Sequence, residues 1–287
     1  MASGKTALIS NGGTYAELNL ENGQLFSLMR GRVEVMWPGG APAERRPAAG
    51  WQNSEIVMFP IVGAAPGDRF LVGERGCLMN QHGLSRYMDW EDISSNSSSV
   101  EMKQFYRAGE VVAGKMPCSF AGSYTLAKSY VLDSEGKLTF TLELKNNSDV
   151  DFRFAAGWHP AFRSVNGGTL TVGHGTVMGF PRSLEDVRKA DGNVLRFDDA
   201  RDVIYRTGDF TVVMAHTFGK TQIWNRGEGL VAIEPITSPS LSGRQPSGTP
   251  APIDINAQED YMWLRREAPV ELQAVVSVYP EEARDET

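Results

Sequence analysis

The chain has 287 residues, of which 41% are hydrophobic and 22% are charged, and its formal net charge is -7. This composition is that of an ordinary globular protein with enough apolar residues for a large core. The negative charge argues against nucleic acid or an anionic membrane as a partner, because both need a basic surface.

Short segments in which apolar and polar residues alternate begin near the middle of the chain and continue to its end. Before them, residues 38–50 are rich in Gly, Pro and Ala, which predicts a surface loop. A period of two is typical of half-buried antiparallel strands. The predicted strands are 126–130, 138–144, 150–154, 169–172, 210–214 and 272–279. Turn-forming residues at 133–137 and 146–149 predict hairpin connections.

Helical periodicity is rare, and only residues 183–189 predict a short turn of helix. Residues 238–252 contain four prolines and predict a second loop, because no strand runs through such a segment. We therefore expect an all-β protein, a large antiparallel β-sandwich with few short helices. Because strand patterns resume on both sides of each loop, we expect a single domain over residues 1–287.

Sorting signals are not visible in the sequence. The first residues lack the apolar stretch of a signal peptide, and no run of about 18 apolar residues predicts a membrane span. Cys77 and Cys118 lie far apart and form no CxxC pattern, so we expect two buried free thiols rather than a disulfide. These features predict a cytoplasmic protein.

Three segments carry residues suited to acid–base chemistry. They contain His82 in NQHGLSR after MFPIVG, His159 in AGWHPAF, and Glu234 in LVAIEPIT. Each residue lies beside Gly or Pro near an expected strand end. Imidazole transfers protons near neutral pH, and a carboxylate within an apolar strand must face solvent, a partner or a cleft. Convergence of the three would place an acid and a base around a small molecule.

Two other interpretations of these residues remain open at this point. His159 taken alone equally fits a histidine that caps a strand end and bonds to the backbone. The two histidines and the glutamate are also potential metal ligands. No pair shows short-range ligand spacing such as HxH or HxxxH, so we expect no metal.

The segments FPIVG, HGLSR, GWHPAF and AIEP, in this order, resemble the aldose 1-epimerase (galactose mutarotase) family. The closest resemblance is to its hexose-6-phosphate epimerase-like branch, and the matching segments run from about residue 8 to residue 279. The resemblance implies a large β-sandwich whose site lies in a cleft on the concave sheet. It also implies a sugar or sugar phosphate as substrate and no cofactor.

The resemblance assigns a role to each candidate residue. Glu234 matches the general base that removes the proton of the C1 hydroxyl, and His159 matches the general acid that protonates the ring oxygen. His82 matches the histidine that binds substrate near that oxygen. An aspartate upstream of the EP motif contacts sugar hydroxyls in this family, and Asp202 is the best match. Asp198 and Asp199 are its rivals.

Further substrate contacts are less well defined. The family places an arginine soon after FPxxG, where this chain has Arg69 a few positions later, and Arg86 after the HG motif is the alternative. Trp158 and Trp224 fit core packing and a pocket lining equally well, and we include Trp158 among the candidates. Ala161 stands where the family commonly has an aromatic residue, which predicts a wider pocket.

The predicted function is that of a cofactor-independent isomerase, an aldose 1-epimerase that interconverts the anomers of a hexose or hexose phosphate by acid–base ring opening. The first alternative is a β-sandwich that binds carbohydrate without turnover. The second is a metal-dependent isomerase or lyase. The sequence leaves open which sugar is used and whether the protein is a monomer or a homodimer.

Overall fold

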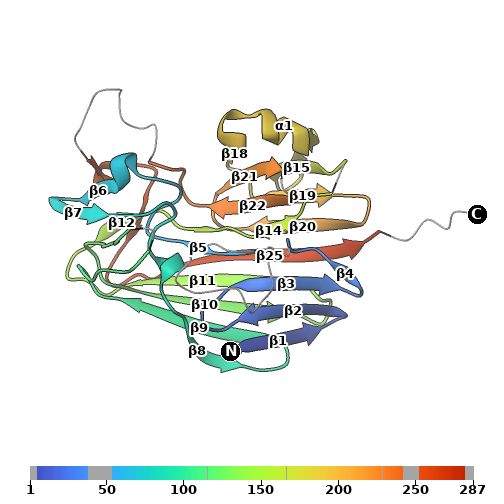
Figure 1. Cartoon of the computed structure of the whole chain (residues 1–287), viewed down its shortest axis with the longest axis horizontal. Coiled ribbons are helices and arrows are strands. Elements are labelled where there is room, and N and C mark those ends of the chain that lie inside the picture. Colours follow the sequence, from blue (N-terminus) through green and yellow to red (C-terminus); the bar gives the residue numbers. More distant parts are fainter. Residues whose placement is uncertain are drawn as a thin grey trace, which may run out of the picture.

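Paired β-strands make up most of the chain in the computed structural model (Figure 1). The structure describes residues 5–37, 54–114, 116–165, 167–227, 229–241 and 252–281. Within these residues the strands form five sheets, and every pairing between them is antiparallel except that of β23 with β6. Two of the sheets are large, and side chains from both enter the buried hydrophobic core.

The largest sheet has ten strands in the order β16-β15-β19-β20-β25-β11-β10-β9-β8, with β17 also paired to β15. Its strands are β8 (Glu91–Ser95), β9 (Ser99–Tyr106), β10 (Tyr124–Leu132), β11 (Leu138–Asn146), β15 (Thr169–His174), β16 (Val177–Met178), β17 (Arg182–Ser183), β19 (Asp202–Arg206), β20 (Phe210–His216) and β25 (Val270–Pro280). Side chains of β10 and β11 are buried at every second position, as one face on a core requires.

The second large sheet has six strands in the order β18-β21-β22-β13-β5, with β14 also paired to β22. Its strands are β5 (Val57–Met58), β13 (Gly157–Trp158), β14 (Ala161–Arg163), β18 (Val194–Asp198), β21 (Lys220–Gly227) and β22 (Leu230–Ile236). Every residue of β22 is buried, and this strand has paired strands on both sides.

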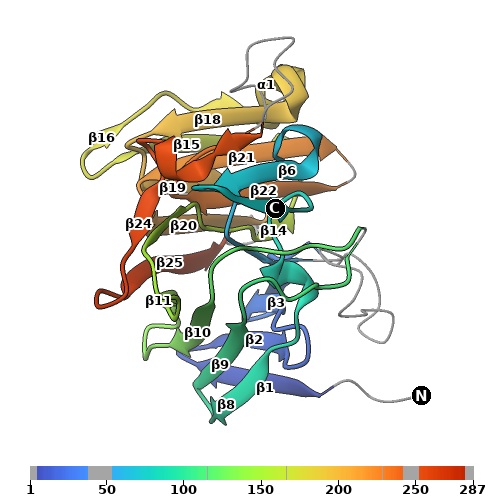
Figure 2. The same ribbon diagram turned by 90° about the vertical axis from the view of Figure 1, so that its left-hand side faces the viewer.

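The remaining elements are short. They are β1 (Thr6–Asn11), β2 (Thr14–Asn19), β3 (Leu25–Arg30), β4 (Val33–Glu34), β6 (Arg69–Val72), β7 (Arg75–Leu78), β12 (Phe152–Phe154), β23 (Ile253–Asp254), β24 (Met262–Leu264), α1 (Leu184–Lys189), and the 3₁₀ turns η3 (Pro66–Asp68), η4 (Ser85–Tyr87), η5 (Asp191–Asn193) and η6 (Ile255–Ala257). Both views place α1 beside β18 at one end of the molecule and β1 at the other (Figures 1 and 2).

The two large sheets pack face to face through aromatic side chains. Trp158 of β13 stacks on Phe140 of β11, with ring centroids 4.7 Å apart and planes at 10°. Phe59, just after β5, makes an edge contact with Tyr124 of β10 at 4.6 Å. Such interdigitation of inward-facing residues is the packing of a β-sandwich.

The predicted all-β sandwich is confirmed by this architecture. The strand predicted at 150–154 is shorter, as β12 begins at Phe152. The short helix predicted at 183–189 is α1, which begins after a capping box of Ser183 and Asp186. Cys77 and Cys118 are buried free cysteines. The loop at 38–50 and residues 242–251 of the second loop lie outside the described residues.

Among the helices in the described part of the chain, none is long and apolar enough to cross a membrane.

Candidate active site

The FPIVG and HGLSR segments are bonded to each other through His82. The His82 amide donates to the Gly63 carbonyl at 2.7 Å, and the Gly63 amide donates to His82 Nδ1 at 3.1 Å. His82 has a φ of 68°, which is unusual for a residue with a side chain. Because Nδ1 accepts a hydrogen bond, the neutral ring carries its proton on Nε2, where it acts as a donor.

The glycine of the HG motif has a steric role. Gly83 has a φ of 84°, and a Cβ at this position would overlap the Phe59 carbonyl group. We therefore expect Gly83→Ala to destabilise the protein by more than the roughly 1–3 kcal/mol of a strained positive φ alone, because the overlap with Phe59 adds to that strain. Chemical denaturation measures this loss.

Gly73→Ala is the matched control for Gly83→Ala, because Gly73 also has a positive φ (62°) but no atom of the described residues, apart from its chain neighbours, lies within 4 Å of its Cβ position. An equal loss of stability in both variants would contradict the steric role of Gly83.

His159 lies between β13 and β14 and is held by its backbone. Its amide donates to the Ile56 carbonyl at 3.0 Å, and the Ala161 amide donates to the Ser54 carbonyl at 2.6 Å. Successive residues of an extended chain point to opposite faces. Trp158 therefore enters the core against Phe140, whereas His159 faces the other way, toward Glu234.

Glu234 lies in β22, directly opposite Gln222 of β21. Its Oε1 is 3.4 Å from His159 Nε2, and its Oε2 accepts a hydrogen bond from Gln222 Nε2 at 2.8 Å. Gln222 Oε1 in turn accepts from Arg196 Nε of β18 at 2.9 Å. The ring of His82 lies edge-on to that of His159, with centroids 5.3 Å apart. The structure thus brings the three predicted catalytic residues into one cluster, which we call the His–His–Glu cluster.

Arg86 is the predicted substrate contact that lies nearest to this cluster. It belongs to η4, four residues after His82, and its charge lowers the pKa of both His82 and His159. Its Nη1 donates to the Gln81 carbonyl at 3.4 Å. Its Nε is buried and has no hydrogen-bond partner among the described residues.

The other predicted substrate contacts lie elsewhere. Trp158 is 1% exposed and belongs to the sandwich core, not to a pocket. Asp202 begins β19 in the larger sheet, where its carboxylate accepts from the Gly175 amide at 2.6 Å and closes the turn after β15. Arg69 is exposed at the start of β6. These three make no hydrogen bond or ion pair with the cluster in the described residues.

Neither rival of Asp202 reaches the cluster. Asp198 forms an exposed ion pair with Lys220 at 2.5 Å, and Asp199 is an exposed turn residue with a φ of 54°. The polar groups that do contact Glu234 and its partner are Gln222 and Arg196, which the sequence analysis missed. The available signal was a glutamine in an apolar strand just before the EP motif, but its pairing with Glu234 depends on strand register.

Burial sets the protonation of the cluster. Glu234 is 1% exposed and His159 is 5% exposed. Burial raises the pKa of Glu234 to about 8, opposed by the Gln222 hydrogen bond and the Arg196 charge. Burial, with a smaller effect of Arg86, lowers the pKa of His159 to about 3, and burial also places the pKa of His82 well below its ordinary value. Burial therefore favours the neutral form of both groups in the unliganded protein, a protonated carboxyl beside a neutral imidazole.

A metal site would need several ligand side chains that converge on one point. In the part of the chain that the structure describes, no group of three or more His, Cys, Asp or Glu side chains is arranged to hold a metal ion. The His82 ring also already receives the Gly63 amide on Nδ1. The geometry of the cluster fits proton transfer between close neighbours.

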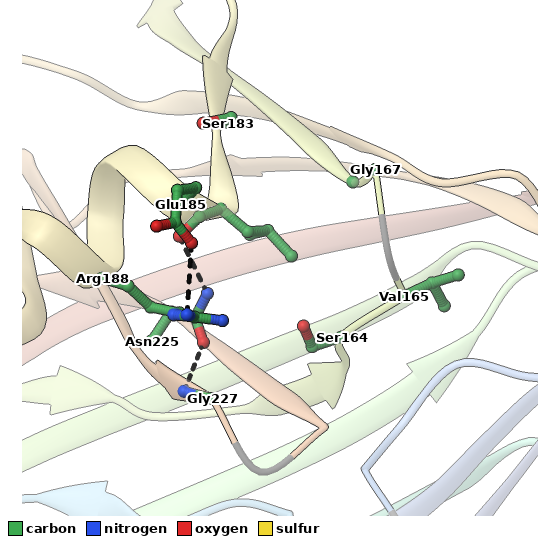
Figure 3. A pocket seen from close by; sticks show the side chains of 10 residues that line it. Ser164, Val165, Gly167, Ser183, Glu185, Arg188, Asn225 and Gly227 are labelled. Atoms are coloured by element: carbon green, nitrogen blue, oxygen red, sulfur yellow. Dashed lines mark hydrogen bonds and ion pairs between the residues drawn. The ribbon is translucent and has the colours of Figure 1, made fainter.

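A separate pocket of about 210 Å³ lies beside α1 (Figure 3). Glu185 and Arg188 form an ion pair across it at 3.2 Å, and Asn225 donates to the Leu184 carbonyl and accepts from the Gly227 amide. These polar groups of the described residues already bind one another, and the His–His–Glu cluster remains the candidate site.

The chain matches a family model, and the match supports the predicted resemblance. Residues 64–204, just under half of the chain, match the model described as aldose 1-epimerase. The matched segment contains His82 and His159 and ends before Glu234. No curated protein matches the chain in sequence. The resemblance to the aldose 1-epimerase family is confirmed, and the assignment to the hexose-6-phosphate branch stays a prediction.

Solved structures show the same fold over nearly the whole chain. A galactose mutarotase-like protein from Lactobacillus casei is 21% identical with a TM-score of 0.77, and the match covers 96% of this chain and 100% of that one. A galactose mutarotase related enzyme from Lactobacillus acidophilus is 17% identical with a TM-score of 0.74, covering 96% and 97%. Galactose 1-epimerase from Lactobacillus acidophilus is 11% identical with a TM-score of 0.66, covering 96% and 99%. At these identities the likeness establishes the galactose mutarotase-like fold.

Proposed function

We propose that this protein is a cofactor-independent aldose 1-epimerase that interconverts the α and β anomers of a hexose or hexose phosphate. The observation that carries the proposal is the 3.4 Å contact between His159 Nε2 and Glu234 Oε1, with the His82 ring beside it. An acid and a base that share one proton are what anomer exchange requires, since no electrons or groups leave the sugar.

The reaction follows from the position of that proton. The shared proton first moves from Glu234 to His159 across their 3.4 Å contact. The Glu234 carboxylate then removes the proton of the C1 hydroxyl while His159 protonates the ring oxygen, and the bond between C1 and the ring oxygen breaks. The products are the open aldehyde, protonated Glu234 and neutral His159. Rotation about C1–C2 and the reverse transfers close the ring as the other anomer.

The raised pKa of Glu234 and the lowered pKa of His159 favour the direction of the first step. Ring opening leaves the proton on the carboxyl group and a neutral imidazole, which is the arrangement that burial stabilises. The Gln222 hydrogen bond orients the carboxylate. In this proposal His82 uses Nε2, which is left to carry the proton because Nδ1 accepts from Gly63, to donate a hydrogen bond near the ring oxygen.

Two arginines support a phosphorylated sugar as a candidate substrate. Arg86 has a buried Nε donor with no partner among the described residues, and Arg196 uses its Nε to hold Gln222. Both guanidinium groups act on the charges of the cluster. Arginine binds phosphate oxygens well because several donors lie in one plane.

The test of the function is anomer exchange measured by NMR on α-glucose, α-galactose and their 6-phosphates. Acceleration above the spontaneous rate with one of these, or with another of about a dozen sugars, is the expected result. A phosphorylated sugar preferred over its parent would support the role of the arginines. Saturable sugar binding without exchange would establish the non-catalytic alternative.

The pH dependence of the reaction is a sharper test of the shared proton. Because the active pair holds one proton, we expect kcat/KM to be nearly constant in mildly acidic to neutral solution. It should fall about tenfold per pH unit above about pH 8, where Glu234 loses that proton. The measurement is exchange NMR between about pH 5 and pH 10 with the spontaneous rate subtracted.

Arg196→Gln provides a second test of the pH profile. The Arg196 charge lowers the pKa of Glu234, so its removal should move the alkaline limb to higher pH. A rate that instead rises through pH 8 would contradict the shared proton and indicate that the carboxyl group must ionise first.

A further inference from the structure

A lysine and a glutamate form an ion pair inside the sandwich, away from solvent. Lys128 Nζ of β10 lies 3.7 Å from Glu55 Oε1, and the two side chains are 1% and 0% exposed. Lys128 also donates to the Gly23 carbonyl and lies 4.3 Å from the centre of the Trp90 ring. Burying two charges costs hydration free energy that can cancel their mutual attraction, so such a pair adds little stability. A role other than stability would explain its presence.

Glu55 is connected to the candidate site through the backbone. It stands between Ser54 and Ile56, whose carbonyls accept hydrogen bonds from the amides of Ala161 and His159 at 2.6 Å and 3.0 Å. The Glu55 Oε2 atom accepts from the Leu25 amide of β3 at 2.9 Å. The backbone of segment 54–57 thus binds the backbone around His159, and the Glu55 side chain connects the same segment to β3 and β10.

The same carboxylate adjoins the aromatic residues under His159. Tyr130 lies next to both Glu55 and Trp158, and the Glu55 charge, after burial, raises the pKa of the Tyr130 hydroxyl. Lys128 lies 5.6 Å from the centre of the Tyr130 ring. Trp158 directly precedes His159 and is stacked on Phe140. The segment 54–57 and Trp158, which both hold the His159 backbone, therefore both lie against residues that contact Glu55.

We propose that Glu55 and Lys128 are positioning residues for His159, which fix the segment 54–57 and Trp158 so that the imidazole stays within reach of Glu234. The pair touches neither Glu234 nor the imidazole of His159 and acts through the Ser54 and Ile56 carbonyls. The effect on turnover rests on the proposed function, whereas the effect on the backbone does not.

The test uses the double variant Glu55→Gln/Lys128→Met. It removes the ion pair without leaving a lone buried charge, so it is expected to fold even if either single variant does not. Hydrogen exchange of the His159 and Ala161 amides is measured by NMR. We expect their exchange to accelerate at least about tenfold more than that of the β11 amides, because local opening adds to global unfolding.

Leu170→Ala provides the matched control, since Leu170 is 1% exposed and lies in β15 of the larger sheet. In Leu170→Ala, the exchange rates of the His159 and Ala161 amides should rise by the same factor as those of the β11 amides. Wild-type protection of these two amides in the double variant, or a loss shared equally by β11, would overturn the proposal.

Turnover adds a second measurement if the wild-type protein exchanges anomers. The double variant should then lose kcat by about tenfold or more while KM changes by less than about threefold, because groups that contact the sugar are intact. A purely structural role would leave kcat of the folded protein unchanged and would overturn the proposal. If the wild-type protein exchanges no anomers, the proposed function fails while hydrogen exchange still decides the role of the pair.

Discussion

Glu234→Gln is expected to lower kcat for anomer exchange by about 10²–10⁴-fold, the usual contribution of a general base. The amide cannot accept the proton of the C1 hydroxyl. It has nearly the same shape as the carboxyl group, and its oxygen can still accept the Gln222 hydrogen bond now made to Oε2. Because burial already favours the neutral form of the Glu234 carboxyl group, the substitution should leave the fold intact. The measurement is exchange NMR at saturating sugar, together with thermal unfolding.

Glu185→Gln is the control for Glu234→Gln. Glu185 is an exposed residue of α1 that pairs with Arg188 beside the separate pocket, and its replacement should leave kcat unchanged. If Glu234→Gln kept more than half of the wild-type rate, the role of Glu234 as base would be wrong even if the reaction itself were confirmed.

The fold was accessible from the sequence wherever a strand has one solvated face. β10 and β11 alternate between buried and partly exposed positions, and the sequence pattern shows the same period. The strand β22 does not alternate, because all of its residues are buried. A continuous apolar run of this kind does not distinguish a strand from a buried helix by periodicity alone.

The catalytic candidates were predicted through local features, and their surroundings were not. His82 and His159 lie at turns and strand ends, and the adjacent Gly83 and Pro160 indicate these positions in the sequence. Gln222 contacts Glu234 through the register of β21 with β22, and Arg196 reaches Gln222 through the register of β18 with β21. Register depends on which strands pair, and no short segment of sequence encodes it.

The positions of Trp158 and Asp202 away from the cluster have the same origin. Adjacent residues in an extended segment point to opposite faces, so Trp158 and His159 cannot both line one site. Asp202 was the best match to the aspartate that the aldose 1-epimerase family carries upstream of the EP motif, and its strand β19 joins the larger sheet. The consecutive strands β18 and β19 belong to different sheets, which no short segment of sequence shows.

His159→Asn is expected to lower kcat by about 10²–10⁴-fold as well, because asparagine cannot protonate the ring oxygen. The backbone bond to Ile56 does not depend on the side chain, so the position of the segment should be kept. The exposed His174 at the end of β15 gives the matched control, and His174→Asn should have the wild-type kcat.

The double variant His159→Asn/Glu234→Gln tests whether the two groups act as one unit. If a single proton passes between them, removing either group already abolishes the transfer, and removing both should lower kcat by no more than about threefold beyond the worse single variant. Exchange NMR on all three variants under one set of conditions measures this coupling. Rate losses that multiply would mean that His159 and Glu234 contribute independently, and the 3.4 Å contact between them would then not be the path of the proton.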